Sequence, residues 1–344
     1  MKAAVFEGLD TLAYRDVDTP VCDAQSVLVR VKACAVCGSD IRIFHHGNNR
    51  VHPPAILGHE IAGEVVAAGE TVTNFQPGDR VAIGADVPCG ACVFCENGIG
   101  NNCQINYAMG YQFPGGFAEY VLLNPTVVNY GPVHKIPDHV SFNEAALAEP
   151  LACVLNALEL SRIRLGDDVV IIGAGPIGIM IIQVARKMGA RKIIMVQRSR
   201  PRLELAKRFG ADVYICSGEE DAIARVQKET GGLGADVVIT ANPSPQSHSD
   251  ALHMAKNRAR VNLFGGLPKG SMVTLDTNLI HYKELFVHGA HGSLPRHHRA
   301  AVDMIASGAI DMKKYISHTF PLGEINAAFA VAEGHAGLRV IVSP

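Results

Sequence analysis

The 344-residue sequence predicts an α/β fold in which a β-rich region is followed by a parallel sheet with crossover helices. Up to about residue 145, short runs with period-two apolar alternation are separated by glycine- and proline-containing turns, a pattern typical of strands. From about residue 167, apolar strand-like runs alternate with helical runs, and this alternation indicates a doubly wound parallel sheet.

Each expected element follows from its own pattern. The β-rich region should contain strands at 26–36, 58–69 and 78–85. The parallel sheet should begin with a strand at 167–173 and end with one at 259–266. Between these lie expected strands at 191–197, 212–216 and 235–240, and expected helices at 176–190, 200–211 and about 221–229. The tail after residue 290 is too short for a domain, so we expect it to pack on the N-terminal half.

Composition and charge exclude several classes of protein. The chain has 31 Lys and Arg against 33 Asp and Glu, a net charge of −2, so it carries no basic field for nucleic acid. Its longest uncharged apolar run, 169–185, is shorter than the ~20 residues that a membrane helix needs. No signal peptide is visible. We expect a cytoplasmic protein without nucleic-acid or membrane partners.

A glycine-rich loop follows the first strand of the parallel sheet. Gly173, Gly175 and Gly178 form a GxGxxG pattern with Pro176 and Ile177 between them, placed between an apolar strand and an apolar helix. In this context the glycines make the tight turn, allow close approach of a pyrophosphate and let helix and strand pack, while the helix N-terminus binds phosphate. The motif predicts a dinucleotide site.

The residues after the second strand favour NADP over NAD. An acidic residue there would bind a ribose 2′-hydroxyl, but this chain has Gln197. Arg198, Ser199 and Arg202 follow, and guanidinium groups bind phosphate through paired, charge-assisted hydrogen bonds. Positive charge at a helix start is unfavourable unless an anion compensates it.

Two sets of residues have the composition of zinc sites. Four thiols lie close together in the sequence, and four thiolates suit a closed, tetrahedral structural zinc; they are Cys89, Cys92, Cys95 and Cys103. Elsewhere, Cys37, His59 and Glu60 supply one thiolate, one imidazole and one carboxylate. Three protein ligands with an open position are typical of a catalytic zinc.

In this order, the metal motifs, the glycine loop and the segment Ala148-Glu149-Pro150 resemble the zinc-containing medium-chain alcohol dehydrogenases, over essentially the whole chain. The motifs GHE and AEP are similar to the branch of sorbitol (L-iditol), galactitol-phosphate and threonine dehydrogenases. The resemblance implies a GroES-like β-barrel catalytic domain (1–150 and 288–344) and a Rossmann cofactor domain (151–287). It also implies one catalytic and one structural zinc, and a homodimer or homotetramer.

The resemblance further implies roles for single residues. Cys37 and His59 would hold the catalytic zinc with either Glu60 or Glu149, and the two glutamates could exchange. Ser39 would relay the proton from the alcohol. Many relatives have a histidine five residues after the ligand cysteine, whereas this chain has Arg42, which cannot act as a base. The neighbouring His45 and His46 could substitute.

The expected activity is hydride transfer between a secondary alcohol of a small polyol-like substrate, or the corresponding ketone, and NAD(P). Amino-alcohol and cyclitol dehydrogenases remain alternatives. A zinc-free reductase would not need the metal motifs, and a non-catalytic dinucleotide sensor would not need an open metal site. We expect His297 and His298, which lie between two arginines, to be solvated at a helix start.

Overall fold

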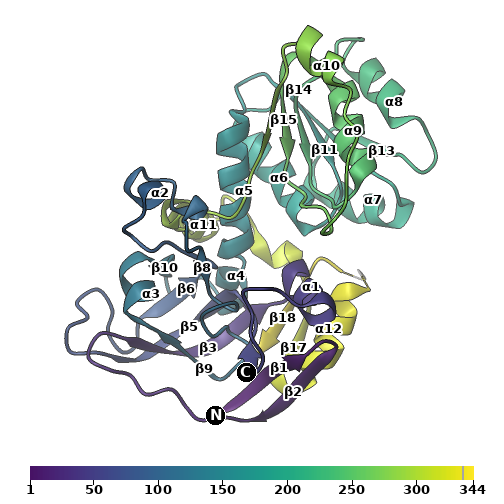
Figure 1. Cartoon of the computed structure of the whole chain (residues 1–344). Helices are drawn as coiled ribbons and strands as arrows, with labels where there is room; N and C mark the ends of the chain where they lie inside the picture. The colour runs from purple at the N-terminus through teal and green to yellow at the C-terminus, as the bar shows by residue number, and fades with distance from the viewer. Residues whose placement is uncertain (335–336) are drawn as a thin grey trace. The chain divides into compact units, whose positions relative to one another are not determined.

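A computed structural model describes residues 1–334 and 337–344 of the chain. By its internal contacts the chain divides into two compact units. Unit 1 comprises Met1–Cys153 and Gly292–Pro344, and unit 2 comprises Val154–His291. Helix α5 (Ala148–Ser161) contains the first crossing between the units. Figure 1 shows the colour change along the chain from purple through green to yellow.

Unit 1 is built on mainly antiparallel sheets, with one parallel pair, β17 and β18. The largest has the strand order β10-β6-β5-β3-β18-β17, with β9 also paired to β3. Its strands are β3 (Val27–Ala35), β5 (Glu60–Ala68), β6 (Arg80–Ile83), β9 (Tyr120–Leu123), β10 (Val133–Lys135), β17 (Ile316–Pro321) and β18 (Arg339–Ser343). The smaller sheets contain β1 (Lys2–Gly8), β2 (Thr11–Asp16) and β4 (Ala55–Ile56), and β7 (Asp86–Val87) with β8 (Tyr107–Ala108).

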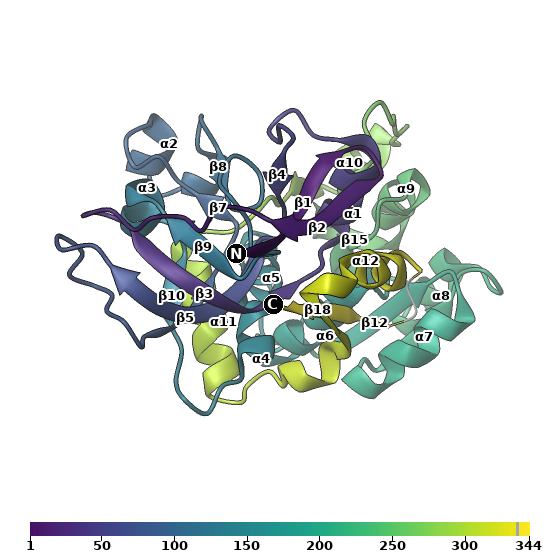
Figure 2. The ribbon, with the colours of Figure 1, turned by 90° about the horizontal axis from the view of Figure 1, so that it is seen from below.

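The strand β3 organises unit 1 because it pairs with three others. Its alternate residues Val27, Val29 and Val31 are buried in the main core cluster, as period-two alternation predicts. β5, β9 and β18 all pair antiparallel to β3, so the C-terminal tail is part of this sheet. Figure 2 shows the yellow C-terminal segment beside the purple strands of the N-terminal region.

Short helices connect the strands of unit 1. They are α1 (Gly38–His46), α2 (Val93–Glu96), α3 (Pro125–Tyr130), α4 (Phe142–Ala146), α11 (Pro295–Ala306) and α12 (Ile325–Glu333), with 3₁₀ turns η1 (Gly100–Asn102), η3 (Met312–Tyr315) and η4 (Leu322–Glu324). Several have side-chain caps: Asn124 accepts a hydrogen bond from Val127 N, and Ser141 forms a capping box with Glu144.

Unit 2 contains a six-stranded parallel sheet in the order β13-β12-β11-β14-β15-β16. This is the order of a Rossmann fold, which confirms the predicted doubly wound sheet. The strands are β11 (Asp168–Ile172), β12 (Lys192–Gln197), β13 (Val213–Cys216), β14 (Ala235–Thr240), β15 (Ala255–Leu263) and β16 (Phe286–Gly289). The prediction that the sheet ends with the strand at 259–266 is wrong, because β16 pairs with β15.

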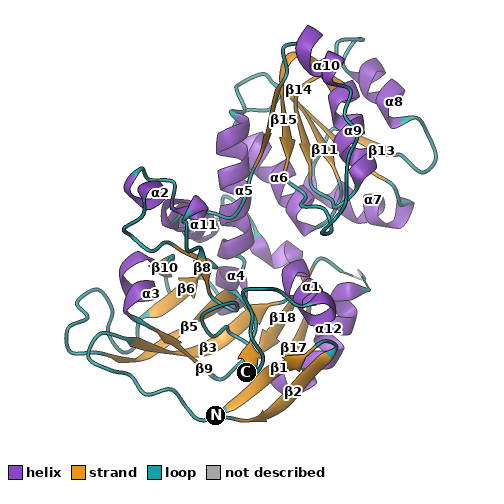
Figure 3. Ribbon diagram, in the orientation of Figure 1, coloured by secondary structure: helices purple, strands orange, loops and turns teal. Residues whose placement is uncertain are grey.

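Helices cover both faces of this sheet. Besides the part of α5 from Val154 on, the helices of unit 2 are α6 (Pro176–Lys187), α7 (Arg200–Ala206), α8 (Ala222–Glu229), α9 (Pro245–Met254) and α10 (Thr277–Tyr282), with the 3₁₀ turn η2 (Lys207–Phe209). Val170 and Ile172 of β11 pack in one core cluster with residues of α8 and α9. The alternate residues Val169 and Ile171 point to the opposite face and are also fully buried. Figure 3 shows the strands lying between purple helices.

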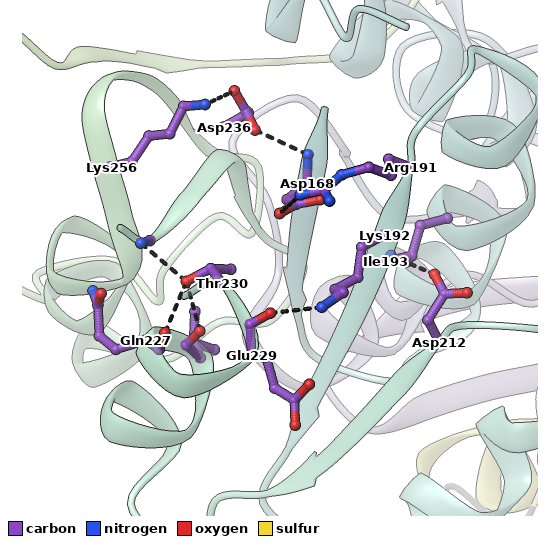
Figure 4. A network of polar contacts seen from close by, with 12 residues as sticks. Asp168, Arg191, Lys192, Ile193, Asp212, Gln227, Glu229, Thr230, Asp236 and Lys256 are labelled. Carbon is purple, nitrogen blue, oxygen red and sulfur yellow. Dashed lines mark hydrogen bonds and ion pairs between the residues drawn. The ribbon is translucent and has the colours of Figure 1, made fainter. Parts of the chain in front are cut away.

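A polar network joins the amino ends of the parallel strands (Figure 4). Asp236 accepts a hydrogen bond from Asp168 N at 3.0 Å and pairs with Lys256, while Arg191 donates to Asp168 at 2.6 Å. Asp212 accepts from Ile193 N at 2.7 Å. The network therefore fixes the starts of β11, β12 and β14, at the edge opposite to their carboxyl ends.

His297 and His298 are buried, so the prediction that they are solvated is wrong. Their side chains are 3% and 1% exposed, respectively. His297 Nδ1 accepts a hydrogen bond from Leu294 N, and His298 Nδ1 lies 2.8 Å from His134 Nδ1. The apolar face of α11 carries these two rings into unit 1. Within the described residues, no helix has both the length and the apolar character needed to span a bilayer.

Candidate active site

Cys37 lies at the point where the chain leaves β3 and enters α1. It is the N-cap residue of α1, with an extended backbone (φ −94°, ψ 153°) and a half-buried side chain. Asp40 closes the first turn, because its Oδ2 accepts a hydrogen bond from Cys37 N at 2.9 Å. The start of the helix thus fixes the position of the thiol.

His59 and Glu60 come from the start of β5, next to the end of β3. Ala35 of β3 pairs with Glu60 in the sheet register. Gly58 precedes them with φ +93°, a conformation that favours glycine, and an added Cβ would lie 2.6 Å from Cys34 Sγ. His59 is 4% exposed and Glu60 is fully buried.

These three side chains form a candidate metal site. The ligand atoms of Cys37, His59 and Glu60 all lie within 4.8 Å of one another. Both carboxylate oxygens of Glu60 are buried without a hydrogen-bond partner, so their lone pairs are available to a metal ion. Burial raises the pKa of Glu60 to about 7, with Arg339 opposing the rise. The donor set and its unsatisfied oxygens fit a zinc ion.

Asp40 is a site residue that the motif analysis missed. It is fully buried, and its Oδ1 lies 3.3 Å from His59 Nδ1 and accepts a hydrogen bond from Gly58 N at 3.3 Å. A carboxylate on Nδ1 leaves the other ring nitrogen, Nε2, free to bind a metal. The spacing of Asp40 three residues after the N-cap Cys37 is that of a capping box, and this signal was present in the sequence.

Arg339 is a second missed residue. It is the first residue of β18 and is 5% exposed, and its Nη1 lies 3.0 Å from Glu60 Oε1. The two atoms form an ion pair without hydrogen-bond alignment, so the Glu60 oxygens stay unsatisfied. Arg339 balances the charge of Glu60 in a buried environment.

Glu149 lies in the first turn of α5, close to the three ligands but not in the same set. Among the described residues, only Cys37, His59 and Glu60 form this mixed cluster. Glu149 is 6% exposed, and burial raises its pKa to about 7, with His59 opposing the rise. Its Oε1 accepts a hydrogen bond from Cys153 Sγ at 3.5 Å.

Ser39 faces the metal cluster from the first turn of α1. Its Oγ lies 3.3 Å from His59 Nε2. Tyr111, which the motif analysis also missed, lies on the same side: its ring centroid is 5.8 Å from that of His59. Burial raises the pKa of Tyr111, and hydrogen bonding with Ser39 opposes the rise. Tyr111 is therefore a neutral hydroxyl next to Ser39.

The two histidines considered for the onward proton route lie elsewhere on α1. His45 is held by carboxylates on both nitrogens, Asp10 Oδ1 at 2.5 Å and Glu333 Oε1 at 2.9 Å. These partners raise the pKa of His45, with Asp10 the larger cause. His46 and Arg42 are exposed. The ion pairs of His45 tie the end of α1 to the β1–β2 turn and to α12.

The four clustered cysteines converge on one point. Sγ–Sγ distances are 3.5 Å for Cys92–Cys95 and 3.9 Å for both Cys89–Cys95 and Cys92–Cys103. A tetrahedron of Zn–S bonds of about 2.3 Å requires sulfur separations of about 3.8 Å. Backbone N–H groups, that of Gln104 first, lower the pKa of Cys92 to about 6. The cluster fits a closed zinc site.

In unit 2 the glycine loop has the geometry that its motif predicts. Gly173 has φ +114°, and an added Cβ at Gly178 would lie 1.8 Å from Gly173 O, so helix and loop are in close contact. An added Cβ at Gly175 meets nothing within 4 Å, which leaves room for a ligand. Pro176 and Ile177 open α6 directly after Gly175, and the unpaired N–H groups of a helix N-terminus are suited to bind phosphate.

Comparison with known proteins identifies the family. Residues 23–138 match the alcohol dehydrogenase GroES-like domain, and residues 176–307 match the zinc-binding dehydrogenase family. The chain is 34% identical to D-arabitol-phosphate dehydrogenase of Enterococcus avium over 332 residues, covering 95% of this chain and 93% of the relative. This chain belongs to the zinc-containing medium-chain alcohol dehydrogenases.

Other members of the family show the same extent of similarity. Sorbitol dehydrogenase of Bombyx mori is 32% identical over 348 residues, covering 99% of this dehydrogenase and 97% of the relative. A solved structure described as a zinc-binding dehydrogenase from Sinorhizobium meliloti 1021, bound to NADP, superposes with a TM-score of 0.93 at 33% identity, over 100% and 99% of the two chains. The predicted α/β fold, family and oxidoreductase class are thereby confirmed.

The residues at the end of β12 and directly after it in this dehydrogenase differ in what they contact. Gln197 Oε1 accepts a hydrogen bond from Ala174 N at 2.9 Å, and Arg202 Nε donates to Ala174 O at 2.9 Å, so both support the glycine loop. Within the described part of the chain, the exposed Arg198 guanidinium has no ion pair or hydrogen bond. Ser199 is the N-cap of α7 but its hydroxyl makes no capping bond.

Proposed function

We propose that this chain is a zinc-dependent dehydrogenase that transfers hydride between a secondary alcohol of a small polyol-like substrate and NADP. The observation that carries this proposal is the convergence of Cys37, His59 and the unsatisfied carboxylate of Glu60 on one point. The relatives named for D-arabitol phosphate and sorbitol support the substrate class. The same site would reduce the corresponding ketone.

Each of the two clusters would hold one zinc ion. Cys37, His59 and Glu60 would hold the catalytic ion, and the buried Glu149, which interacts electrostatically with His59 and Cys37, is the candidate to replace Glu60. Bound there, zinc would polarise the alcohol oxygen as a Lewis acid. The four-cysteine cluster leaves no open position, so it would stabilise its loop without taking part in the reaction.

The protein's own residues position these groups and move the proton. Asp40 Oδ1, 3.3 Å from His59 Nδ1, would orient the ring so that its other nitrogen binds the metal. Ser39 Oγ would accept the alcohol proton as it releases its own hydroxyl proton, which would pass by way of the neighbouring Tyr111 hydroxyl to solvent. The carbinol carbon would give its hydride to the nicotinamide ring.

Ser39→Ala tests this proton route. We expect turnover to fall by about 10²–10⁴-fold, the range of general acid–base catalysis, while zinc content stays unchanged. Tyr111→Phe is the companion variant and should lower turnover less, because Ser39 remains. Near-wild-type turnover of Ser39→Ala would refute the relay.

The proposed preference for NADP rests on Arg198 and Ser199, because the side chains of Gln197 and Arg202 form hydrogen bonds with the backbone of the glycine loop. A guanidinium without a protein partner suits the 2′-phosphate, and the S. meliloti relative was solved with NADP. Arg198→Ala should lower kcat/KM for NADP by about 10- to 100-fold, the loss of a charge-assisted hydrogen bond. Arg200→Ala is the matched control, since Arg200 pairs with Glu219.

A homodimer or homotetramer is the expected assembly. The edge strand β16 has unpaired backbone groups on one side and carries Phe286, which is 58% exposed. An apolar residue on an open sheet edge is a candidate contact between subunits. Light scattering coupled to size exclusion tests this expectation, and a monomer would contradict it.

Zinc analysis together with a substrate panel tests the proposed function. The panel contains sugar alcohols, a cyclitol and threonine, each with NADP and with NAD. We expect one zinc in each cluster and the highest kcat/KM for an acyclic polyol with NADP. Preference for threonine or the cyclitol would select those alternatives, and absence of any turnover in the zinc-replete protein would refute the dehydrogenase assignment.

A further inference from the structure

A cavity of about 410 Å³ lies in unit 1, next to the candidate active site. Residues from β1, β2, the segment around β4 and the segment 111–114 line it, so one compact unit forms all of its wall. Most of the wall is apolar. The polar lining consists of Arg15, Arg50, His52, Tyr111 and Gln112, and among the residues that the structure describes no carboxylate lines the cavity.

Arg50 is the central cation of this cavity. Its Nη2 donates to Asn106 O and to Gln112 Oε1, the latter at 3.3 Å. Its Nε is buried without a hydrogen-bond partner, and Arg50 forms no ion pair with any described residue. A half-buried guanidinium that lines a cavity and has no counter-charge is suited to bind an anion.

Two further side chains with N–H donors line the cavity. Arg15 lines the cavity from β2, and its Nε lies 3.0 Å from Glu7, which is outside the lining. His52 lies exposed at the rim. Two guanidinium groups and an imidazole suit a doubly charged phosphate monoester better than a neutral hydroxyl.

Tyr111 connects the cavity to the metal cluster. Its ring lies 4.8 Å from the Arg50 guanidinium carbon, and its centroid is 5.8 Å from that of His59. These two distances bound the separation of the His59 ring and the Arg50 guanidinium to at most 10.6 Å. A short carbon chain with a terminal phosphate spans such a distance.

We propose that this cavity binds the phosphate group of a phosphorylated acyclic polyol, with the Arg50 guanidinium as its main ligand. The inference rests on the proposed function, because it takes the reacting alcohol to lie at the metal cluster. Tyr111 separates the two ends of the substrate, so it determines which carbon of the chain reaches the metal. Arg50 acts on substrate selection and takes no part in the hydride transfer.

The experiment compares D-arabitol with its terminal phosphate as substrates of the zinc-replete enzyme. We expect kcat/KM to be about 10- to 100-fold higher for the phosphate, the strength of one charge-assisted contact, with the difference mainly in KM. Arg50→Gln should bring the two values together. Arg50→Lys should recover part of the difference, since both variants lose the guanidinium contacts to Asn106 and Gln112 and only the lysine keeps the charge.

Arg42→Gln is the matched control, because Arg42 is an exposed arginine of α1 that does not line the cavity. This variant should keep the full difference in kcat/KM between the phosphorylated and the neutral polyol. Calorimetry with inorganic phosphate adds a readout besides activity, and we expect binding to the wild type that Arg50→Gln abolishes.

Equal kcat/KM for the neutral and phosphorylated polyol would overturn the inference and leave the proposed function intact. The same holds if inorganic phosphate binds but phosphorylation of the substrate has no effect. The inference would also be overturned if the difference in kcat/KM between the two polyols persisted in Arg50→Gln and disappeared in Arg42→Gln. That result would place the phosphate outside this cavity. Failure to oxidise any alcohol would refute the proposed function, and the substrate subsite with it.

Discussion

The substitution Asp40→Asn tests how this dehydrogenase holds its catalytic metal. Asp40 is fully buried and makes three contacts: it accepts from Cys37 N at 2.9 Å and from Gly58 N at 3.3 Å, and it lies 3.3 Å from His59 Nδ1. It therefore links both backbone segments that carry the thiolate and imidazole ligands. Asparagine has nearly the same shape but no charge, so the change isolates the electrostatics.

The magnitude follows from these contacts. Asparagine has one acceptor oxygen and one amino group, so in either orientation the amino group faces a backbone N–H or the imidazole of His59. A buried donor that loses its acceptor costs about 1–3 kcal/mol of stability. Loss of the carboxylate behind a metal-binding histidine typically weakens the metal site 10- to 100-fold. That factor corresponds to about 1.4–2.8 kcal/mol of zinc binding free energy.

Chelator competition at fixed pH measures this loss directly as an apparent zinc affinity, and circular dichroism checks that the variant folds. Asp10→Asn is the control, because Asp10 is an exposed aspartate that pairs with His45 at the far end of the same helix. It should leave zinc affinity unchanged. A folded Asp40→Asn protein with zinc affinity within about twofold of wild type would refute the positioning role of Asp40.

Three further predictions concern other parts of the chain. Gly178→Ala should destabilise unit 2 and abolish cofactor binding, because its Cβ would lie 1.8 Å from Gly173 O; a wild-type melting temperature with normal cofactor binding would contradict this. Cys92→Ser should release one zinc and lower the melting temperature, and retention of both metals would contradict the closed site. The third concerns pH: burial lowers the pKa of His134 to about 4 and that of His298 well below its usual range.

The sign of the pH effect follows from proton uptake by the unfolded chain. Below pH 6.5 the two histidines bind protons in the unfolded chain but stay neutral in the folded protein. Their contribution to the free energy of unfolding is therefore fully present above pH 6.5 and is lost as the pH falls toward 4. For His134 this loss is at most about 3 kcal/mol. Calorimetry at pH 7.5 and 5.0 should show a larger drop in melting temperature for the wild type than for His134→Leu. An equal drop would contradict the burial argument.

Much of the fold and the ligand sets could be predicted because the patterns are local. The alternation of strands and helices after residue 167, the glycine loop and the cysteine spacing each lie within one short segment. β16 was missed because its four residues, Phe286–Gly289, are half exposed and show no clear alternation. His297 and His298 were misread because only packing shows that the face of α11 that carries them is buried.

The rest of the site depends on sheet order, which no local pattern contains. Arg339 reaches Glu60 because β18 and β5 both pair with the end of β3: Ala35 is opposite Glu60 on one side and Ile341 on the other. Tyr111 reaches the cluster from a separate segment. Gln197 was expected at the ribose, yet its side chain turns to Ala174, a choice of rotamer that the sequence cannot show.

The proposed reaction depends on a zinc ion held by Cys37, His59 and a carboxylate, with one position open to the substrate. Anomalous scattering at the zinc edge, measured on crystals of the zinc-replete enzyme, tests it most directly. We predict a peak about 2.3 Å from Cys37 Sγ, about 2.0–2.1 Å from a ring nitrogen of His59 and about 2.0–2.2 Å from a carboxylate of Glu60 or Glu149. Zinc density confined to the four-cysteine cluster would contradict the account.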